Sequence, residues 1–361
     1  MIHLVSNKKI LVCGAGGGGS NNLIRSIRKS GINVWIVGTN LSKYYAAKSN
    51  ADITYVLPPA TEEEEYISKL AQVIKDEKVE LVIPNSDREV HTISKNRHRI
   101  DARIFLPKQS IIEVCQDKFQ LYNKMKDNGI PMAETYEVTS YEEIPSIFEK
   151  LGNPEKVWCR MKKGSGSKGA TSLKNPHQAK FWISYWEEMR GFPHTNFLLS
   201  SMLPGRDFAF QSTWKDGEMV LGKICERLEY VGGDNRASGV SSSPQLGKTV
   251  YDQRVLDLCQ KTVKLLDPNA TGNYSFDLKE DASGNINICE INIGRFCMIT
   301  PIFDLTGKHN MAETYIKIAF DETLDIPEPI DIEEDYYLIR ELDTEPLILH
   351  AKEVEERIRY V

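Results

Sequence analysis

Short apolar runs alternate with helical segments through the first 107 residues, and this alternation is the strongest constraint on the fold. Each apolar run has the length of a strand, whereas the segment at 62–76 has the length of a helix and an acidic first turn. The predicted strands cover residues 9–13, 33–39, 52–57, 80–84 and 102–107. Strands that alternate with helices indicate a parallel sheet, so we predict an α/β domain here.

A glycine-rich turn follows the first predicted strand. Residues 14–19 read Gly-Ala-Gly-Gly-Gly-Gly, and residues 21–30 then have helical character. This layout is typical of a dinucleotide-binding turn, which leaves NAD or FAD binding as one alternative. Such a site needs an acidic residue near the tip of the second strand, whereas residues 37–40 read Val-Gly-Thr-Asn. The missing acid favours another role for the turn.

A predicted hairpin gathers oxygen-bearing side chains on one face. Two strand-like runs, at 273–279 and 285–293, flank an Asp-Ala-Ser-Gly turn. Asp277 lies on the first run, and Glu290 and Asn292 are two residues apart on the second, so they point to the same face. Carboxylate and amide oxygens suit Mg²⁺, which often accompanies a nucleoside triphosphate. The alternative is an edge hairpin with solvent-facing polar residues.

A basic, glycine-rich loop follows another predicted strand. The segment begins as a strand at 156–161 and becomes a Gly/Ser/Lys loop at 163–170. Its glycines allow the backbone to approach an anion. The positive residues of the segment are Arg160, Lys162, Lys163 and Lys168. The spacing is not that of a Walker A loop. A lid over a triphosphate is one interpretation, and a solvated hairpin tip is the other.

Together these segments resemble the ATP-grasp superfamily of ligases, of the carbamoyl-phosphate-synthase large-subunit type. Asp-Lys at 117–118 opens a helix that ends before Gly129, and residues 197–203 are similar to the adenine hinge of the family. The resemblance runs from about residue 9 to 325. It implies that ATP binds to Lys118, Arg160, Lys163, Gly164, Ser165, Gly166, Ser167, Gly169, Ser200, Met202, Leu203 and Asp207. It also implies that Asp277, Glu290 and Asn292 hold two Mg²⁺ ions, a role that Mn²⁺ can also fill.

Three positions depart from the pattern of the family. Ser200 stands where many relatives have Glu, and Asp207 replaces the commoner Glu. Most relatives place an Arg two residues after the metal-binding Asn, but that position is Gly294 here and Arg295 follows it. A catalytic role for Arg295, in contact with a phosphate or acyl phosphate, is therefore implied with an offset of one residue.

Two further segments are candidates for contact with a substrate. Arg236 lies in a polar loop at 231–244 that is similar to the loop over the reaction centre in carbamoyl-phosphate-synthase-like members, which implies a catalytic role. Asp87 and Glu89 follow the fourth predicted strand, at the edge of the sheet where ligands gather. A plain surface loop and a helix N-cap are the respective alternatives.

Composition narrows the class of protein further. The net charge is −6 and the pI is near 5.8, which is not the profile of a nucleic-acid-binding protein. No run reaches about 18 apolar residues, so we expect no membrane span, and the first residues lack the layout of a signal peptide. The seven cysteines include no Cys-x-x-Cys, and the seven histidines show no zinc spacing. We therefore expect reduced cysteines and a cytoplasmic protein.

The resemblance also implies a domain order and an activity. We predict a Rossmann-like α/β domain at 1–108 and a two-lobed ATP-grasp domain of α+β character at 109–325, with its lid at 153–199. Strands and a helix at 326–361 should complete the ATP-grasp core. Such ligases join a small-molecule carboxylate to an amine or similar nucleophile through an acyl phosphate, and release ADP and phosphate. No nucleic acid or membrane partner is implied, and a homodimer is compatible with the resemblance. A non-catalytic ATP-binding regulator and an NAD(P)-dependent oxidoreductase remain as alternatives.

Overall fold

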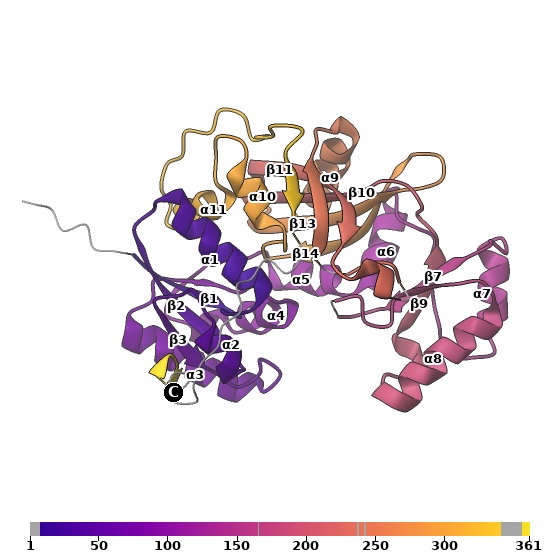
Figure 1. The fold of residues 1–361 in the computed structure, drawn as a ribbon, viewed down its shortest axis with the longest axis horizontal. Helices are drawn as coiled ribbons and strands as arrows, with labels where there is room; N and C mark the ends of the chain where they lie inside the picture. The colour runs from indigo at the N-terminus through magenta and orange to yellow at the C-terminus, as the bar shows by residue number, and fades with distance from the viewer. Residues whose placement is uncertain (1–7, 165, 237, 242, 341–355) are drawn as a thin grey trace, which may run out of the picture.

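The computed structural model describes residues 8–164, 166–236, 238–241, 243–340 and 356–361, and their strands form three sheets. We call these the N-terminal sheet, the central sheet and the lid sheet. Figure 1 shows the N-terminal domain at the lower left, the lid at the lower right, and the central sheet above and between them. This arrangement confirms the predicted α/β fold class. No helix in the described ranges is long and apolar enough to cross a membrane.

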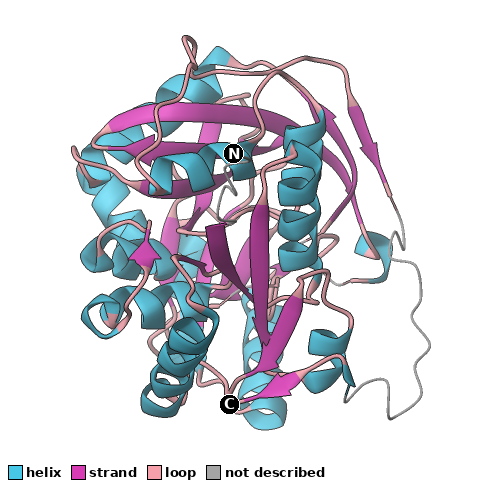
Figure 2. Cartoon of the chain, turned by 90° about the vertical axis from the view of Figure 1, so that its left-hand side faces the viewer, coloured by secondary structure: helices cyan, strands magenta, loops and turns pink. Residues whose placement is uncertain are grey.

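The N-terminal sheet is parallel, as the alternation of strands and helices predicts. Its strands are β1 (Lys8–Cys13), β2 (Val34–Asn40), β3 (Ile53–Val56), β4 (Leu81–Ile83), β5 (Arg103–Ile104) and β16 (Arg359–Tyr360), in the order β16-β3-β2-β1-β4-β5. Its helices are α1 (Gly18–Ser30), α2 (Lys43–Ala47), α3 (Glu63–Glu77) and α4 (Asp87–Lys95). Helices cover both faces of this sheet (Figure 2), because Ile10 and Val12 pack toward α1 whereas Leu11 packs toward α3.

The last described strand corrects one expectation about the domains. We expected residues 326–361 to complete the ATP-grasp core, and β15 (Tyr337–Ile339) does pair with β12 (Pro244–Thr249) of the central sheet. Strand β16, however, pairs in parallel with β3 at the edge of the N-terminal sheet. The buried side chain of Ile358 packs beside Ala46 and Ala47 and holds it there. Residues 341–355 of the segment expected to complete the core lie outside the described residues.

The central sheet is antiparallel, with one apolar face and one face that carries both apolar and polar residues. Its order is β14-β13-β10-β11-β12-β15, with β10 (Asp207–Lys215), β11 (Glu218–Tyr230), β13 (Gly272–Glu280) and β14 (Ile286–Ile293). Phe208, Phe210 and Phe276 pack in one core with residues of α5 (Gln109–Gln116) and α9 (Gln253–Leu266). Because successive side chains alternate between faces, Asp207, Gln211 and Asp277 point away from that core. On that opposite face Ala209 and Cys225 pack in a second core with Phe303, so only the remainder of the face is available for a site.

The lid sheet has the order β6-β9-β7-β8 and is larger than the predicted lid. Its strands are β6 (Thr135–Glu137), β7 (Val157–Met161), β8 (Thr171–Leu173) and β9 (Phe197–Ser201), covered by α7 (Ile144–Lys150) and α8 (Pro176–Arg190). Strand β6 and helix α7 precede the predicted range of 153–199, which was too short because β6 pairs with β9 from a distant part of the chain. Helix α6 (Lys118–Asp127) lies between this sheet and the rest of the protein, as Figure 1 shows.

A buried ion pair joins the central sheet to the helices behind it. Lys223 on β11 is 1% exposed, and its Nζ lies 3.2 Å from Asp331 Oδ2 and donates to Thr306 O at 2.7 Å. Thr306 follows α10 (Thr300–Leu305), which packs with α11 (Met311–Ala319) against α1. The ammonium is therefore satisfied only while β11 and α10 keep their positions.

We predict that Asp331→Ala lowers the free energy of unfolding by about 3–5 kcal/mol, because it leaves a buried charge without its partner. Chemical denaturation measures the loss. Glu218→Ala is the matched control, since Glu218 and Lys264 form an exposed pair at 3.8 Å, and a change within about 0.5 kcal/mol is expected. Equal losses in the two variants would contradict the role given to the buried pair.

Candidate functional site

The β13–β14 hairpin brings together the three residues predicted to bind a metal. Asp277 pairs directly with Glu290, and Asn292 pairs with Ser275 on the same face. Asn292 Nδ2 donates to Asp277 Oδ2 at 3.0 Å. A bulge at Cys289 shifts the alternation of β14, because Leu278 pairs with Ile288 while the next residue, Asp277, pairs with Glu290. The bulge lets Ile288 pack in the core while Glu290 faces the site.

This donor set fits Mg²⁺. Two carboxylates and one amide supply hard oxygen atoms, which Mg²⁺ prefers over sulfur and nitrogen. Among the described residues, no three His, Cys, Asp or Glu side chains form a group that could hold a metal. The hairpin set has two carboxylates, and its third member is the amide of Asn292. Asp277, Glu290 and Asn292 are therefore the residues that would hold the ion.

Two basic residues reach the hairpin from other elements. Asp117 caps α6 by accepting from the backbone N–H of Phe119 and Gln120, both at 3.1 Å, and so fixes Lys118 in the first turn. Lys118 Nζ lies 3.1 Å from Glu290 Oε2 and donates to Gly164 O at 3.0 Å. One ammonium thus connects the hairpin to the lid loop.

Arg160 makes the second connection, from strand β7 of the lid sheet. Its guanidinium donates to Cys289 O at 3.0 Å, a carbonyl that lies at the bulge. Its Nε is buried and has no hydrogen-bond partner in the described part of the chain. A buried donor without a partner is costly, so an anion oxygen bound here would satisfy it.

The two carboxyl groups of the hairpin differ in their affinity for a proton. Burial raises the pKa of Asp277 above its usual range, although the Arg227 guanidinium lowers it in part. Burial also raises the pKa of Glu290, but the Lys118 ammonium and a hydrogen bond from Asp277 outweigh burial and leave this pKa below its usual range. A proton added to the pair therefore goes to Asp277, and a cation bound to both carboxylates would displace it.

Arg295 reaches the site despite its offset in sequence. Its Nε donates to Asp87 Oδ1 at 2.6 Å, and its NH2 group donates to Asn292 Oδ1. Position 294 has no room for a side chain, because φ of Gly294 is 73° and a Cβ there would lie 2.8 Å from Val90 Cγ1. The turn at Gly294 directs the next side chain back toward the hairpin. Since Asp87 begins α4, Arg295 also joins the N-terminal domain to the site.

Sequence reasoning missed Arg227, which lies in the centre of this face. Its Nε donates to Asp207 Oδ1 at 2.8 Å, and its NH1 group donates to Asp277 Oδ1 at 2.7 Å. Asp207, predicted to bind ATP, also accepts from Tyr230 Oη at 2.7 Å through its other oxygen. Its position gave no local signal, because Arg227 reaches these carboxylates only through the pairing of β11 with β10 and of β10 with β13.

Other predicted residues fall in four places. Ser200 is buried in the middle of the lid sheet, where β9 pairs with β6 and β7, and Met202 and Leu203 lie in the segment that joins β9 to β10. Lys163 Nζ lies 3.4 Å from Asp117 Oδ2 at the edge of the lid loop. The structure records no contact between the side chain of Arg236, exposed after η3 (Gly233–Asn235), and the described hairpin residues.

Three glycines and one serine give the lid loop its shape. Gly164, Gly166 and Gly169 have φ values of 111°, 79° and 66°, and Ser167 has 56°. A Cβ at Gly164 or Gly166 would meet no atom within 4 Å, whereas one at Gly169 would lie 2.9 Å from the ring of Phe197. The first two glycines therefore face open space and the third packs on the lid sheet. Ser165 lies outside the described residues.

The glycine-rich turn after β1 is filled by protein atoms. A Cβ on Gly19 would lie 2.9 Å from Met298 Sδ, and one on Gly16 would lie 1.7 Å from Tyr45 O. Asn22 Nδ2 donates to Met298 O at 3.1 Å and fixes the segment after Arg295 against α1. Close packing accounts for these glycines without a dinucleotide.

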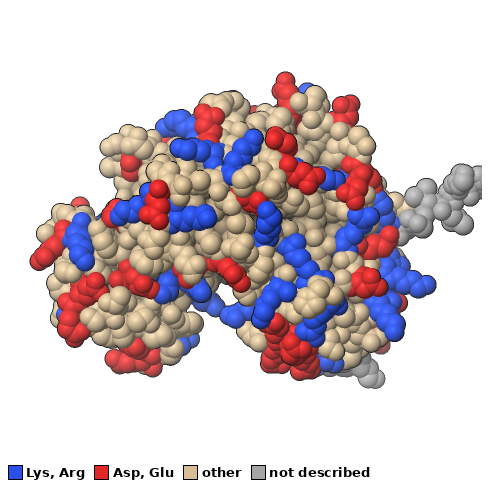
Figure 3. All heavy atoms as spheres, turned by 180° about the vertical axis from the view of Figure 1, so that it is seen from behind, with Lys and Arg blue, Asp and Glu red and all other residues tan. Residues whose placement is uncertain are grey.

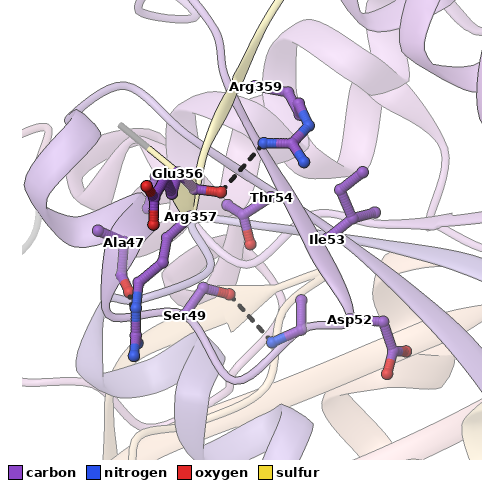
Figure 4. Close-up of a pocket in the computed structure, with 10 residues that line it drawn as sticks. Ala47, Ser49, Asp52, Ile53, Thr54, Glu356, Arg357 and Arg359 are labelled. Atoms are coloured by element: carbon purple, nitrogen blue, oxygen red, sulfur yellow. Dashed lines mark hydrogen bonds between the residues drawn. The ribbon is translucent and has the colours of Figure 1, made fainter. Parts of the chain in front are cut away.

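Basic side chains surround the space between the lid and the N-terminal domain. In the view from behind, Lys and Arg side chains line the notch between these two lobes (Figure 3). A separate cavity of about 240 Å³ lies in the N-terminal domain and is lined by residues of α2 and β3 and by Glu356, Arg357 and Arg359 (Figure 4). Its lining contains none of the predicted site residues.

The arrangement of the three sheets agrees with the predicted ATP-grasp fold, and the comparisons with known proteins confirm this fold. Residues 10–104 match the family model described as PylC-like, N-terminal domain. This match begins within β1 and ends at the last residue of β5. The comparison with curated proteins gives no match.

Solved structures resemble nearly the whole chain. The biotin carboxylase domain of 2-oxoglutarate carboxylase from Hydrogenobacter thermophilus has a TM-score of 0.67 at 17% identity, over 91% of this chain and 73% of that one. The L-amino acid ligase from Bacillus licheniformis has a TM-score of 0.67 at 12% identity, over 88% of this chain and 75% of that one. Carboxyaminoimidazole ribonucleotide synthase from Aspergillus clavatus has a TM-score of 0.66 at 16% identity, over 90% of this chain and 80% of that one. At these identities the likeness is one of fold.

We predict that NAD⁺ and NADH leave the thermal unfolding midpoint unchanged, because Met298 and Tyr45 occupy the turn where a pyrophosphate would bind. Differential scanning fluorimetry with each dinucleotide checks this expectation, and ATP with Mg²⁺ serves as the comparison ligand. A rise in the midpoint with NAD⁺ would show that the turn opens to a dinucleotide.

Proposed function

We propose that this chain is an ATP- and Mg²⁺-dependent ligase that joins a carboxylate to an amine or a similar nucleophile. In this proposal the γ-phosphate is transferred to the carboxylate, which forms an acyl phosphate and releases ADP. The nucleophile then attacks the acyl carbon, phosphate leaves, and the nucleophile gives up a proton to solvent. The N-terminal domain, the central sheet and the lid are the parts between which these substrates would bind.

One observation carries the proposal: five residues scattered along the sequence converge on one face of the β13–β14 hairpin. Lys118 comes from α6, Arg160 from β7, and Asp277, Glu290 and Asn292 from the hairpin. Phosphoryl transfer needs position and charge neutralisation more than a protein nucleophile. A cluster of cations beside a set of oxygen ligands meets both needs.

Each residue of this cluster has a proposed role. Arg160, with its buried and unpaired Nε, would receive a phosphate oxygen, and Lys118 would exchange its contact with Glu290 for the nucleotide. Bound Mg²⁺ would neutralise charge on the phosphates. Ser200, Met202 and Leu203 would contact the adenine, and Arg295 would contact the transferred phosphoryl group. Arg236 is retained as a further candidate for an anionic substrate.

The ligands and activities of proteins with similar structures support the proposal of a ligase. The biotin carboxylase domain was solved with MgADP and bicarbonate, and the ribonucleotide synthase was solved with ATP. Another neighbour is an L-amino acid ligase. No observation on this chain favours the regulator or the oxidoreductase over a ligase. A panel of amino acids and small carboxylates, scored for ADP formation in pairs with amines, tests the proposal directly.

We predict that Glu290→Gln lowers kcat of ADP formation by at least about 100-fold while the fold remains intact, since it removes a charge from the metal-binding set. Circular dichroism and the denaturation midpoint check the fold. Glu280→Gln is the matched control on the same hairpin, because Glu280 pairs with Arg254 at 3.0 Å near the turn. Near-normal turnover of Glu290→Gln would show that the metal-binding residues are misassigned.

We predict that hydrogen exchange in the lid loop, residues 162–169, slows when an ATP analogue binds with Mg²⁺. The loop is charged and glycine-rich, and Gly164 and Gly166 face open space, so little packing at these two positions holds it closed without a ligand. Peptides from β1 and β4, which are buried, provide the internal control. Exchange that is slow without nucleotide, or indifferent to it, would mean that the loop is a rigid hairpin.

A further inference from the structure

Arg227 joins two carboxylates that the resemblance assigns to different ligands. Its Nε and NH2 groups lie 2.8 Å and 2.6 Å from Asp207 Oδ1, and its NH1 group lies 2.7 Å from Asp277 Oδ1. Its NH2 group also donates to Phe208 O at 2.9 Å. The side chain is 12% exposed, so this guanidinium is fixed within the site rather than free in solvent.

This contact leaves Oδ2 as the oxygen of Asp277 that no guanidinium contacts. A cation bound to Oδ1 would lie beside the Arg227 guanidinium, whose positive charge would repel it. Oδ2 points to the Asn292 amide at 3.0 Å, and Asn292 Oδ1 accepts from Arg295. Sites for two metal ions hold them about 3.5–4 Å apart on shared carboxylates. The oxygen atoms of Asp277, Glu290 and Asn292 that remain can hold one metal ion more easily than two.

The charges around Arg227 also favour one metal ion over two. The Arg227, Asp207 and Asp277 group carries one guanidinium and two carboxylates, and Lys118 lies beside Glu290. A second divalent ion would add charge next to a cation that cannot lose its proton. Arg227 therefore already supplies positive charge where a second ion would bind.

We propose that Arg227 replaces one of the two divalent cations expected for the family, so that the site holds a single ion for each bound nucleotide. The inference rests on the proposed function, because it presupposes a nucleotide at this hairpin. Arg227 is a positioning residue in this scheme: it fixes Asp277 and contributes a permanent charge. The second charge of the site would then be independent of the concentration of Mg²⁺.

The test counts Mn²⁺ bound with a non-hydrolysable ATP analogue, using the full chain. Equilibrium dialysis gives the number of ions per bound nucleotide, and electron paramagnetic resonance distinguishes an isolated Mn²⁺ from a spin-coupled pair. We expect one uncoupled ion in the wild type and two coupled ions in Arg227→Gln. Arg206→Gln is the matched control, because Arg206, directly before β10, forms a nearby ion pair with Glu226 of β11 at 2.7 Å. It should keep one ion.

The outcomes of this test distinguish the single-ion inference from the ligase proposal. Two coupled ions in the wild type, or one ion in both the wild type and Arg227→Gln, would overturn the inference while leaving the ligase proposal in place. A wild type that binds no nucleotide would overturn the ligase proposal and this inference with it. If Arg227→Gln does not fold, the double variant Asp207→Asn/Arg227→Gln, which removes the pair together, takes its place with the same expected gain of one ion.

Discussion

Side chains alternate between the two faces of the central sheet, and the rest of the structure depends on this alternation. Phe208, Phe210 and Phe276 lie on the apolar face, and their sequence neighbours Asp207 and Asp277 lie on the opposite one. The same residues that bury the core therefore present the charges of the site. A shift in register by one residue would place carboxylates against α9 and phenyl rings in the site, at a cost to both.

The bulge at Cys289 is where the alternation is adjusted. Ile286 and Ile288 belong to the core before it, and Ile291 and Ile293 belong to the core after it. An uninterrupted strand would have put Ile288 and Glu290 on one face. The extra residue solves this conflict and leaves a carbonyl that accepts from Arg160 of the lid sheet. Packing of the core and contact with the lid thus have one local cause.

Local sequence patterns predicted much of this structure. The parallel sheet follows from the alternation of strands and helices, and the face shared by Glu290 and Asn292 follows from their spacing on one strand. Features that depend on distant partners could not be read in this way. Arg227 is central only because β11 lies beside β10, and β16 joins the N-terminal sheet through pairing with β3. The glycine turn shows the same limit, because Met298, which fills it, lies far away in sequence.

Strand β16 also has a mechanical consequence. The N-terminal domain is attached to the rest of the chain by the segment after β5, and β16 ties a second segment to its opposite edge at β3. Arg295 and Asp87 add a cross-link between the two parts. A body anchored at several points resists rotation, whereas the lid sheet contacts the hairpin through a few long side chains. Thermal motion in this molecule should therefore concentrate in the lid, with the N-terminal domain and the central sheet behaving as one base.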